Sequence, residues 1–501
     1  ADEEPPRGPN KDAVKIALQF AKLVGAKIVE EMHFMRKVVV DGSNTSGFQR
    51  TGLIATGGKI EYDGKILELD QLCLEEDSCR HGDEGHEYLL DRLGVPLLEI
   101  TTKPQLNDSN DVQKAAKTIG RLLRACNVKR GLGTIRQDVN VSIDNGQRVE
   151  LKGFQDLTSM PKVVENEVRR QTNLNKLEKT TTGQATVVNE CFNNKKEFAL
   201  ALKVKNWNGI LGNKKSPEDH IRMGRELSDY AKRAGMKGIM HSDELPDYGI
   251  KLEETNNIKN KLKCKKDDAF ILIFGKEKKV RNAIELVIER INTQGVPKEV
   301  RKVTPENFTR YLRPMPGASR MYPETDIAPL KVNNIKILKP KTLDEREKDL
   351  PLNKEESKQL VSKDLDNQFS VLNQKYNLPK LISRILLHTL PQLKEEGKNI
   401  VNSDLEKVLD LFEKGKIVKE GISNALIQSS NNEDIQINSG NIEKEVKEHI
   451  ENLVEEKVDF IKERGMSAVG ALMGPVMSEF KGKMDGGDIN KLLMEKIKEI
   501  I

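Results

Sequence analysis

The sequence predicts a multidomain α+β protein, in which an antiparallel-sheet domain is interrupted by a compact α/β insertion and followed by an all-helical domain and a small helical tail domain. The chain has 501 residues, more than one hydrophobic core usually serves, so about three or four domains are expected. Short strands punctuated by glycine dominate its first part, and strands alternate with helices near its middle. After Pro340 the pattern is almost entirely helical.

Composition indicates a soluble globular protein with a charged surface. Hydrophobic residues make up 37% and charged residues 32% of the chain, so there are enough apolar residues to form hydrophobic cores. No stretch approaches the roughly 18 consecutive apolar residues of a membrane span, and nothing at the start resembles a signal peptide. We therefore expect a cytoplasmic protein with no membrane contact. The five cysteines are too scattered for a disulfide framework, and a net charge of +5 leaves nucleic-acid binding to local basic faces.

The first part of the chain is expected to combine two helices with an antiparallel sheet. Apolar residues recur at helical spacing over residues 11–27. Alternating segments over residues 38–74 are separated by Gly42, Gly47, Gly57, Gly58 and Gly64, which is typical of strands joined by tight turns. A second helix is predicted over residues 109–126, with Asn107 or Ser109 as its cap.

Two further strands are predicted over residues 134–143 and 148–153. The sequence pattern changes after about residue 193. The middle region is predicted to contain a helix over 217–234, a strand over 270–274 and a helix over 278–294. A helical bundle over 344–420 and a helical tail over 441–501 follow.

Four segments between residues 70 and 155 place a carboxylate beside a turn or strand, at Glu75 and Glu76, Glu99, Asp138 and Glu150. Glu99 lies in an apolar run, where a carboxylate facing a core is costly unless it is paired or bound to a metal. Converging carboxylates repel one another, and a hard cation such as Mg²⁺ holds them ionised. A Mg²⁺ and nucleotide site is therefore one hypothesis. Exposed strand residues, or partners of Arg and Lys in surface ion pairs, are the alternative for each acid.

Two weaker signals lie nearby. Cys73, Cys79, His81 and His86 fall within one short stretch, but their spacing fits no common zinc pattern, so reduced thiols and solvent-exposed histidines are favoured over a zinc site. The segment 131–134 is glycine-rich but lacks the spacing of a phosphate loop, which favours a tight turn.

Taken in order, the acidic segments resemble the B/E family of tRNA-dependent amidotransferase subunits. The segments that carry the resemblance are Glu75-Glu76-Asp77, Arg92-Leu93-Gly94-Val95-Pro96-Leu97-Leu98-Glu99-Ile100, Asp138-Val139-Asn140-Val141-Ser142, Glu150-Leu151-Lys152 and the run from Arg313 to Asp326. The region from about 190 to 303 resembles the insertion domain of bacterial-type aspartyl-tRNA synthetases, which indicates the archaeal E type. The segment 465–477, followed by Gly482, resembles the helical tail that both subunit types share.

The resemblance implies a domain order along the whole chain. The expected parts are a cradle or catalytic domain (1–190), an aspartyl-tRNA-synthetase-like insertion (191–303), the returning part of the cradle (304–343), a helical domain (344–440) and a YqeY-like tRNA-binding tail (441–501).

The activity implied by the resemblance has two steps. ATP phosphorylates the γ-carboxylate of glutamate esterified to tRNA(Gln), and ammonia then displaces phosphate to give Gln-tRNA(Gln). The resemblance implies that Glu76, Glu99, Asp138 and Glu150 hold Mg²⁺, with Glu75 as the substitute for Glu76. Arg136 and Lys152 are expected to contact phosphate, with an ordinary salt bridge as the alternative for each.

The resemblance also implies partners. Ammonia is expected from an asparaginase-like D subunit in a hetero-oligomer with two copies of each chain. Glu-tRNA(Gln) is expected to contact the tail through lysines such as Lys481, Lys483 and Lys491, for which a solvated helix face is the alternative. Family members begin with a Gly-x-Glu-x-His segment whose His joins the metal site, and this sequence has no such segment. A tRNA-binding or assembly subunit without an intact kinase site is the competing function, and an aspartyl-tRNA synthetase relative is a third.

Overall fold

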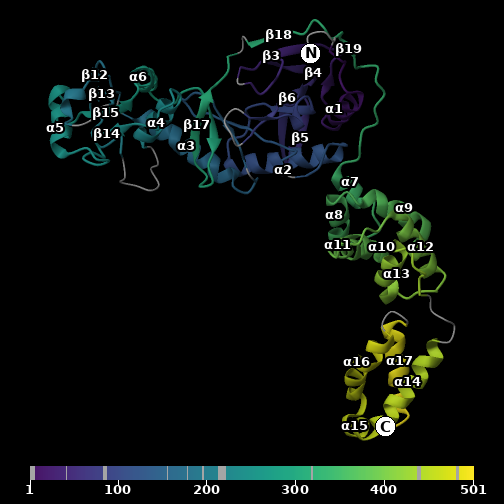
Figure 1. The fold of residues 1–501 in the computed structure, drawn as a ribbon. Helices are drawn as coiled ribbons and strands as arrows, with labels where there is room; N and C mark the ends of the chain where they lie inside the picture. Colours follow the sequence, from purple (N-terminus) through teal and green to yellow (C-terminus); the bar gives the residue numbers. More distant parts are fainter. Residues whose placement is uncertain are drawn as a thin grey trace. The chain divides into compact units, whose positions relative to one another are not determined.

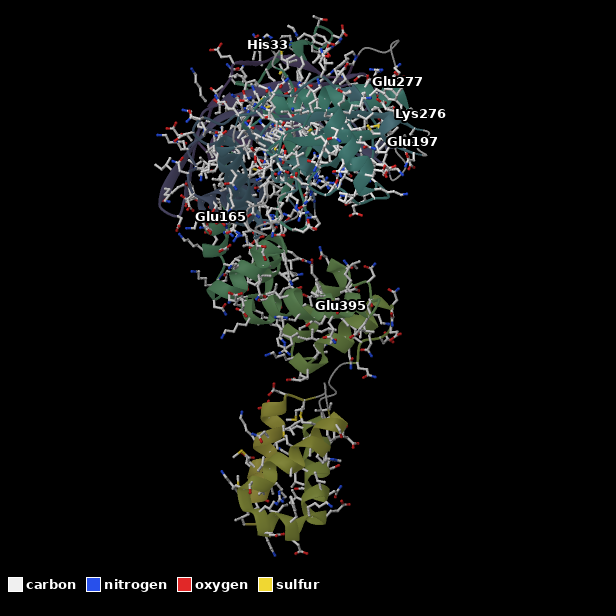
Figure 2. The ribbon with its side chains drawn as sticks, turned by 90° about the vertical axis from the view of Figure 1, so that its left-hand side faces the viewer. His33, Glu165, Glu197, Lys276, Glu277 and Glu395 are labelled. Atoms are coloured by element: carbon white, nitrogen blue, oxygen red, sulfur yellow. The ribbon has the colours of Figure 1, made fainter. Side chains whose placement is uncertain are left out.

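The computed structural model describes residues 6–40, 42–82, 87–131, 133–154, 156–177, 179–193, 197–212, 222–317, 320–436, 442–480 and 484–501. The chain divides into two compact units, Ala1–Pro340 and Lys341–Ile501 (Figure 1). Many charged side chains lie on the outside, as Lys276 and Glu277 at the start of one helix illustrate (Figure 2). Among the described residues, no helix is both long and apolar enough to cross a membrane.

The first unit begins with a sheet of seven strands in which every pairing is antiparallel, as the sequence predicts. The path runs β18-β3-β4-β6-β5, while β1 pairs with β4 and β9 pairs with β6. The strands are β1 (Lys27–Ile28), β3 (Phe34–Val38), β4 (Phe48–Thr56), β5 (Lys59–Tyr62), β6 (Lys65–Glu76), β9 (Pro96–Thr102) and β18 (Met321–Pro323). Asp63 and Gly64 both have positive φ between β5 and β6, which is the backbone that a two-residue hairpin turn requires.

Helix α1 (Lys11–Leu23) packs against β4 and β6 on one face of this sheet (Figure 1). Its buried residues join a core with Leu72, Leu74 and Ile100 of β6 and β9. The helix ends four residues before the predicted end, because Gly25 has a positive φ and Lys27 already pairs in β1.

Helix α2 (Ser109–Ala125) confirms the second predicted helix, but its cap differs from the prediction. The cap is Asp108, whose carboxylate accepts hydrogen bonds from the backbone N–H groups of Asn110 and Asp111 at 2.8 and 3.1 Å. Neither Asn107 nor Ser109 takes this role, because only the residue just before the first helical turn places its side chain over those N–H groups.

The cap gives a first testable expectation. Asp108→Ala is expected to lower the free energy of unfolding of the first unit by about 1 kcal/mol, since two helix N–H groups lose their acceptor. The midpoint of thermal or urea unfolding measures this loss. Asn107→Ala is the matched control and is expected to change stability by less than about 0.5 kcal/mol. An equal loss in both variants would contradict the assignment of the cap.

A second sheet has the order β10-β11-β16-β17, with β11 and β16 parallel. Its strands are β10 (Val139–Val141), β11 (Val149–Lys152), β16 (Glu299–Val303) and β17 (Thr309–Pro314), and α3 (Met160–Lys176) follows β11 in sequence. The expected boundary at residue 303 places β16 in the insertion, whereas its pairing with β11 joins it to the sheet that precedes the insertion.

The middle region forms a third sheet, β12-β13-β15-β14, whose pairings are all antiparallel. Its elements are β12 (Thr186–Val187), β13 (Phe198–Val204), α4 (Met223–Lys232), β14 (Met240–His241), α5 (Leu252–Lys261), β15 (Ala269–Gly275) and α6 (Glu277–Asn292). The predicted strand over 270–274 and helix over 278–294 are confirmed. The start of the helix predicted over 217–234 falls partly outside the described residues, which resume at 222. Both faces of β15 are buried, which explains its unbroken apolar sequence.

A buried charge network joins α3, α4 and β16. Arg301 is 1% exposed and donates hydrogen bonds to Glu226 at 2.7 Å and to Glu299 at 2.5 Å. Arg170 donates to Glu167 at 2.9 Å and to Glu226 at 3.4 Å. Burial raises the pKa of Glu226, but Arg301 and Arg170 outweigh burial and hold that pKa at about 2. Glu226 therefore remains ionised inside the protein.

The second unit is helical throughout its described residues, as the sequence predicts. Its first helices are α7 (Leu343–Lys348), α8 (Lys354–Ser362), α9 (Asp366–Tyr376), α10 (Pro379–Arg384), a π-helical turn at Ile385–Thr389, α11 (Leu390–Glu395), α12 (Asn402–Glu413) and α13 (Ile422–Ser430). The tail contains α14 (Ile442–Glu456), α15 (Val458–Arg464), α16 (Ala468–Phe480) and α17 (Gly486–Lys498), which share one apolar core.

Candidate active site

The pairing of β6 with β9 decides which carboxylates share a face of the first sheet. Cys73 pairs with Glu99, and Glu75 pairs with Leu97 on one side and with Thr51 of β4 on the other. Because Leu72, Leu74 and Ile100 face α1, the alternating residues Cys73, Glu75 and Glu99 point to the opposite face.

Glu99 differs from what the apolar run around it suggests. That run predicts a carboxylate facing a core, whereas the structure leaves Glu99 exposed on the sheet face opposite α1. The apolar neighbours Leu98 and Ile100 are the residues that pack toward α1. The carboxylate of Glu99 is therefore accessible to a ligand.

Glu75 and Glu99 form the first half of the site. Lys37 of β3 contacts Glu75 with Nζ 2.6 Å from Oε1, and Gln49 of β4 donates to the other oxygen of Glu75 at 3.4 Å. Glu75 also acts on Glu99 through its charge and through a side-chain hydrogen bond. The surrounding protein, the charge of Glu75 and that hydrogen bond together raise the pKa of Glu99 to about 7, although Lys37 opposes the shift.

Asp138, Glu150 and Lys152 form the second half. Val149 and Leu151 are fully buried, so the intervening Glu150 and Lys152 point away from that core. Lys152 Nζ lies 2.7 Å from Glu150 Oε1 and also donates to the carboxylate of Asp138. Burial lowers the pKa of Lys152, but Asp138 and Glu150 outweigh burial, so this pKa is raised and the ammonium keeps its charge.

The two halves interact. The charge of Asp138, which directly precedes β10, contributes to the raised pKa of Glu99, so these two carboxylates act on each other. The structure therefore brings Glu75, Glu99, Asp138 and Glu150 to one region with two lysines. Lys37 was missed in the sequence, because only the pairing of β3 with β4 places it beside Glu75.

Glu76 lies on the other face of the sheet, although the sequence grouped it with Glu99. Its carboxylate is 3.5 Å from Arg50, whose Nε donates to Glu324 at 2.8 Å. Arg36 holds the same Glu324 through two hydrogen bonds of 2.6 and 2.8 Å, and these bonds lower the pKa of Glu324 to about 2. This arginine clamp, formed by Arg36, Arg50 and Glu324, fastens the returning strand β18 to the sheet. Glu75 and Glu76 lie on opposite faces of the sheet because consecutive strand residues alternate between faces.

Arg136 contacts a carboxylate rather than open solvent. Its Nη2 donates to Asp77 at 3.0 Å, and the backbone of Asp77 bonds to Val95 and Gly94 at the turn before β9. The structure therefore shows Arg136 in a salt bridge, which was the alternative to phosphate contact. Contact of Arg136 with phosphate stays a prediction.

The site has the chemistry that a magnesium ion needs, but its carboxylates do not form a ready-made cage. Within the described residues, no three His, Cys, Asp or Glu side chains are arranged to hold a metal ion. The donors are carboxylate oxygens, which suit Mg²⁺. The raised pKa of Glu99 marks an excess of negative charge that a divalent cation would relieve. The residues therefore fit the ion by donor type and charge.

The other residues singled out in the sequence have separate positions. Burial raises the pKa of Cys73 to about 11, and Cys79 donates to the backbone oxygen of Ser43, while His86 lies outside the described residues. Lys491 of α17 is exposed and pairs with Asp488 at 3.2 Å. Lys481 and Lys483 lie outside the described residues.

Comparison with known families gives the context for this site. Residues 4–337 match the model of the GatB/GatE catalytic domain, and residues 367–497 match that of the GatB domain. The chain belongs to the GatB/GatE family. The resemblance seen in the sequence is therefore confirmed, and membership makes the chain a component of an amidotransferase enzyme.

Relatives in this family align along the whole chain. Two relatives are the E subunits of the glutamyl-tRNA(Gln) amidotransferases of Archaeoglobus fulgidus and Methanocaldococcus jannaschii. Both are 40% identical to this chain, the first over 541 and the second over 547 aligned positions. Each alignment covers 100% of this chain and 86% of the relative. The corresponding protein of Methanothermobacter thermautotrophicus is 39% identical over 538 positions with the same coverage.

Proposed function

We propose that this chain is the tRNA-dependent amidotransferase subunit that uses ATP and Mg²⁺ to phosphorylate the γ-carboxylate of Glu-tRNA(Gln) and then amidates it with ammonia. The observation that supports this most directly is the gathering of Glu75, Glu99, Asp138 and Glu150 with Lys37 and Lys152. The relatives described above carry glutamyl-tRNA(Gln) amidotransferase in their names.

The chemistry explains why such a site is useful. A carboxylate is a poor electrophile until one oxygen becomes a good leaving group, which phosphorylation provides. Mg²⁺, when bound, lowers the cost of bringing the phosphate and carboxylate anions together. In our proposal Glu99, Asp138 and Glu150 hold the ion, and Glu75 replaces Glu76 because it shares the face of Glu99.

The two lysines have a different role in this proposal. Lys152 remains a cation because Asp138 and Glu150 raise its pKa. It is therefore suited to bind a phosphate oxygen and unsuited to act as a base. Lys37, which contacts Glu75, is placed to attract the same anions. Arg136 remains a candidate phosphate contact only if it leaves Asp77.

A separate supply of ammonia is part of the proposal. Cys73 is the thiol nearest to Glu99 in the strand pairing, and its raised pKa of about 11 keeps it neutral and a weak nucleophile. We therefore propose an asparaginase-like D subunit as partner, in a hetero-oligomer with two copies of each chain. We also propose that residues 441–501 and an aspartyl-tRNA-synthetase-like insertion at 191–303 contact the tRNA, with Lys481, Lys483 and Lys491 near its backbone.

The experiment that tests the function is amidation of Glu-tRNA(Gln) by the full chain with ATP, Mg²⁺ and free ammonium. Gln-tRNA(Gln) is expected to form when ammonium is the nitrogen donor but not when glutamine is. None of the steps proposed for this chain releases ammonia from glutamine. EDTA is expected to abolish the product, and excess Mg²⁺ to restore it. Turnover that persists without a divalent cation would contradict the proposed site.

The competing function is a tRNA-binding or assembly subunit without a kinase step. One observation favours it: Lys37 and Lys152 already form ion pairs with carboxylates of the site, and the described residues contain no group of three or more side chains arranged to hold a metal ion. Release of ADP that depends on Glu-tRNA(Gln) separates the two functions. Binding of the tRNA without ADP release, in the presence of ammonium, would support the competing function.

A further inference from the structure

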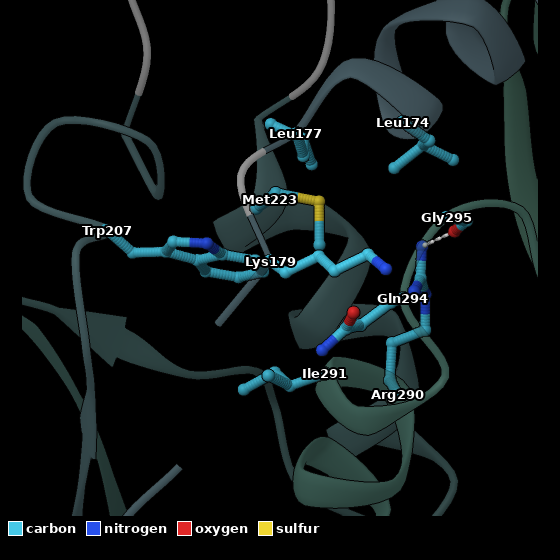
Figure 3. A pocket seen from close by; sticks show the side chains of 9 residues that line it. All are labelled: Leu174, Leu177, Lys179, Trp207, Met223, Arg290, Ile291, Gln294 and Gly295. Carbon is cyan, nitrogen blue, oxygen red and sulfur yellow. Dashed lines mark hydrogen bonds between the residues drawn. The ribbon is translucent and has the colours of Figure 1, made fainter. Parts of the chain in front are cut away.

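Figure 3 shows a pocket of the first unit that is too small for an organic ligand. Trp207, Met223 and Arg290 are among the residues that line it, and its volume is about 20 Å³. A cavity of this size holds about one water molecule. This pocket therefore carries no ligand site, and a cation suited to a phosphate lies elsewhere in the unit, on β16.

Lys302 of β16 lies beside the carboxylate site. It pairs with Lys152 in the parallel ladder of β11 and β16. Residues in register on neighbouring strands point to the same side of a sheet, and such strands are about 4.8 Å apart. The stem of Lys302 also runs beside the end of β11, since a Cβ placed at Gly153 would lie 3.7 Å from its Cγ. Lys302 is therefore the next cation after Lys152 across the second sheet.

The charged side chains on either side of Lys302 already have partners. Lys152 donates to the carboxylate of Asp138. Arg310 of β17, which pairs with Lys302 in the ladder, donates two hydrogen bonds to Asp229 of α4. Lys302 itself is exposed, and among the described residues none forms a side-chain hydrogen bond or ion pair with its ammonium. The ammonium of Lys302 is therefore free to bind an anion.

The carboxylate site has no positive charge left over for a nucleotide. In our proposal its four carboxylates, on Glu75, Glu99, Asp138 and Glu150, are balanced by two lysines and one Mg²⁺. A triphosphate adds several negative charges, and phosphate sites commonly supply a lysine in addition to the metal ion. The proposed site therefore needs a further cation that is not already paired.

We propose that Lys302 supplies this cation and binds a phosphate oxygen of ATP. Lys152 and Lys302 then hold the triphosphate from neighbouring strands, next to the carboxylates of Asp138 and Glu150. The flexible stem of a lysine lets its ammonium follow the phosphate. This inference rests on the proposed function, because it assigns one more contact to the same substrate.

Binding of ATP to the full chain tests this contact directly. Equilibrium dialysis with labelled ATP and excess Mg²⁺ gives the Kd for the parent and for each variant. Lys302→Gln removes the charge and is expected to raise the Kd about tenfold or more, the usual effect of losing a hydrogen bond to a charged group. Lys302→Arg keeps the charge and is expected to stay within about threefold of the parent.

Lys59→Gln is the matched control. Lys59 is an exposed strand residue of β5, and its variant is expected to bind ATP as the parent does. The inference is overturned if the parent binds no ATP, or if Lys302→Gln binds ATP as tightly as the parent. In the second case a raised KM for Glu-tRNA(Gln) in Lys302→Gln would assign this lysine to the tRNA instead.

A separate measurement decides the proposed function, namely ADP release and Gln-tRNA(Gln) formation by the parent. ATP binding that depends on Lys302, without either product, would refute the proposed function but not the contact. Formation of both products, with equal affinity for ATP in Lys302→Gln and the parent, would refute only the contact.

Discussion

Replacing Glu99 with glutamine is expected to lower the rate of Gln-tRNA(Gln) formation by roughly 100-fold or more, with ATP, Mg²⁺ and ammonium supplied. The substitution keeps the size of the side chain but removes an anionic oxygen from the proposed metal site, and loss of one strong electrostatic contact typically costs about 10²–10³ in kcat. Glu150→Gln is expected to show a similar loss, because Glu150 belongs to the second half of the same site. Initial rates measured on both variants give the answer.

The control for this experiment is Glu61→Gln, an exposed strand position on β5 that is expected to keep the parent rate. Glu75→Gln and Glu76→Gln provide a sharper comparison. Because Glu75 shares the face of Glu99 and Glu76 does not, the structure favours the larger loss in Glu75→Gln. Undiminished turnover in both Glu99→Gln and Glu150→Gln would refute the proposed site.

The second large effect concerns the buried charge network. Arg301→Met is expected to destabilise the first unit by about 3–5 kcal/mol, the usual cost of leaving buried charges without their partner. The loss is large because Arg301 serves both Glu226 and Glu299, and Arg170 then remains 3.4 and 3.7 Å from them. The midpoint of thermal unfolding of the full chain measures the effect.

Arg281→Met is the matched control for this prediction. Arg281 pairs with Glu277 on α6 at 2.7 Å, but both side chains are more than half exposed. An exposed pair of this kind contributes at most about 1 kcal/mol, so the control is expected to unfold close to the parent. Equal midpoints for Arg301→Met and the parent would show that the network contributes little to stability.

The sequence predicts the kinds of element well, because periodicity and glycine punctuation are local signals. The helices α1, α2 and α6 and the strand β15 all lie where the pattern places them. The cap of α2 was misplaced by one residue, since Asn107, Asp108 and Ser109 are all good caps and only the backbone decides among them.

The arrangement of the site depended on information that the sequence does not contain. Whether Glu75 or Glu76 faces Glu99 is set by the register of β6 against β9, and a shift of one residue reverses the answer. Lys37 lies far from Glu75 in sequence and meets it only through β4. The segments that carry the family resemblance were nevertheless visible, because they are short and lie in order.

The pairing of β3 with β18 has a consequence for synthesis of the chain. Strand β3 ends at Val38, whereas its partner β18 begins at Met321. During translation at about 5–20 residues per second, the nascent chain exposes this edge of the sheet for roughly 15 to 60 s before its partner leaves the ribosome. An unpaired edge is a template for association with other strands. The interval before the arginine clamp can close is therefore the period in which a nascent chain of this protein most needs protection from aggregation.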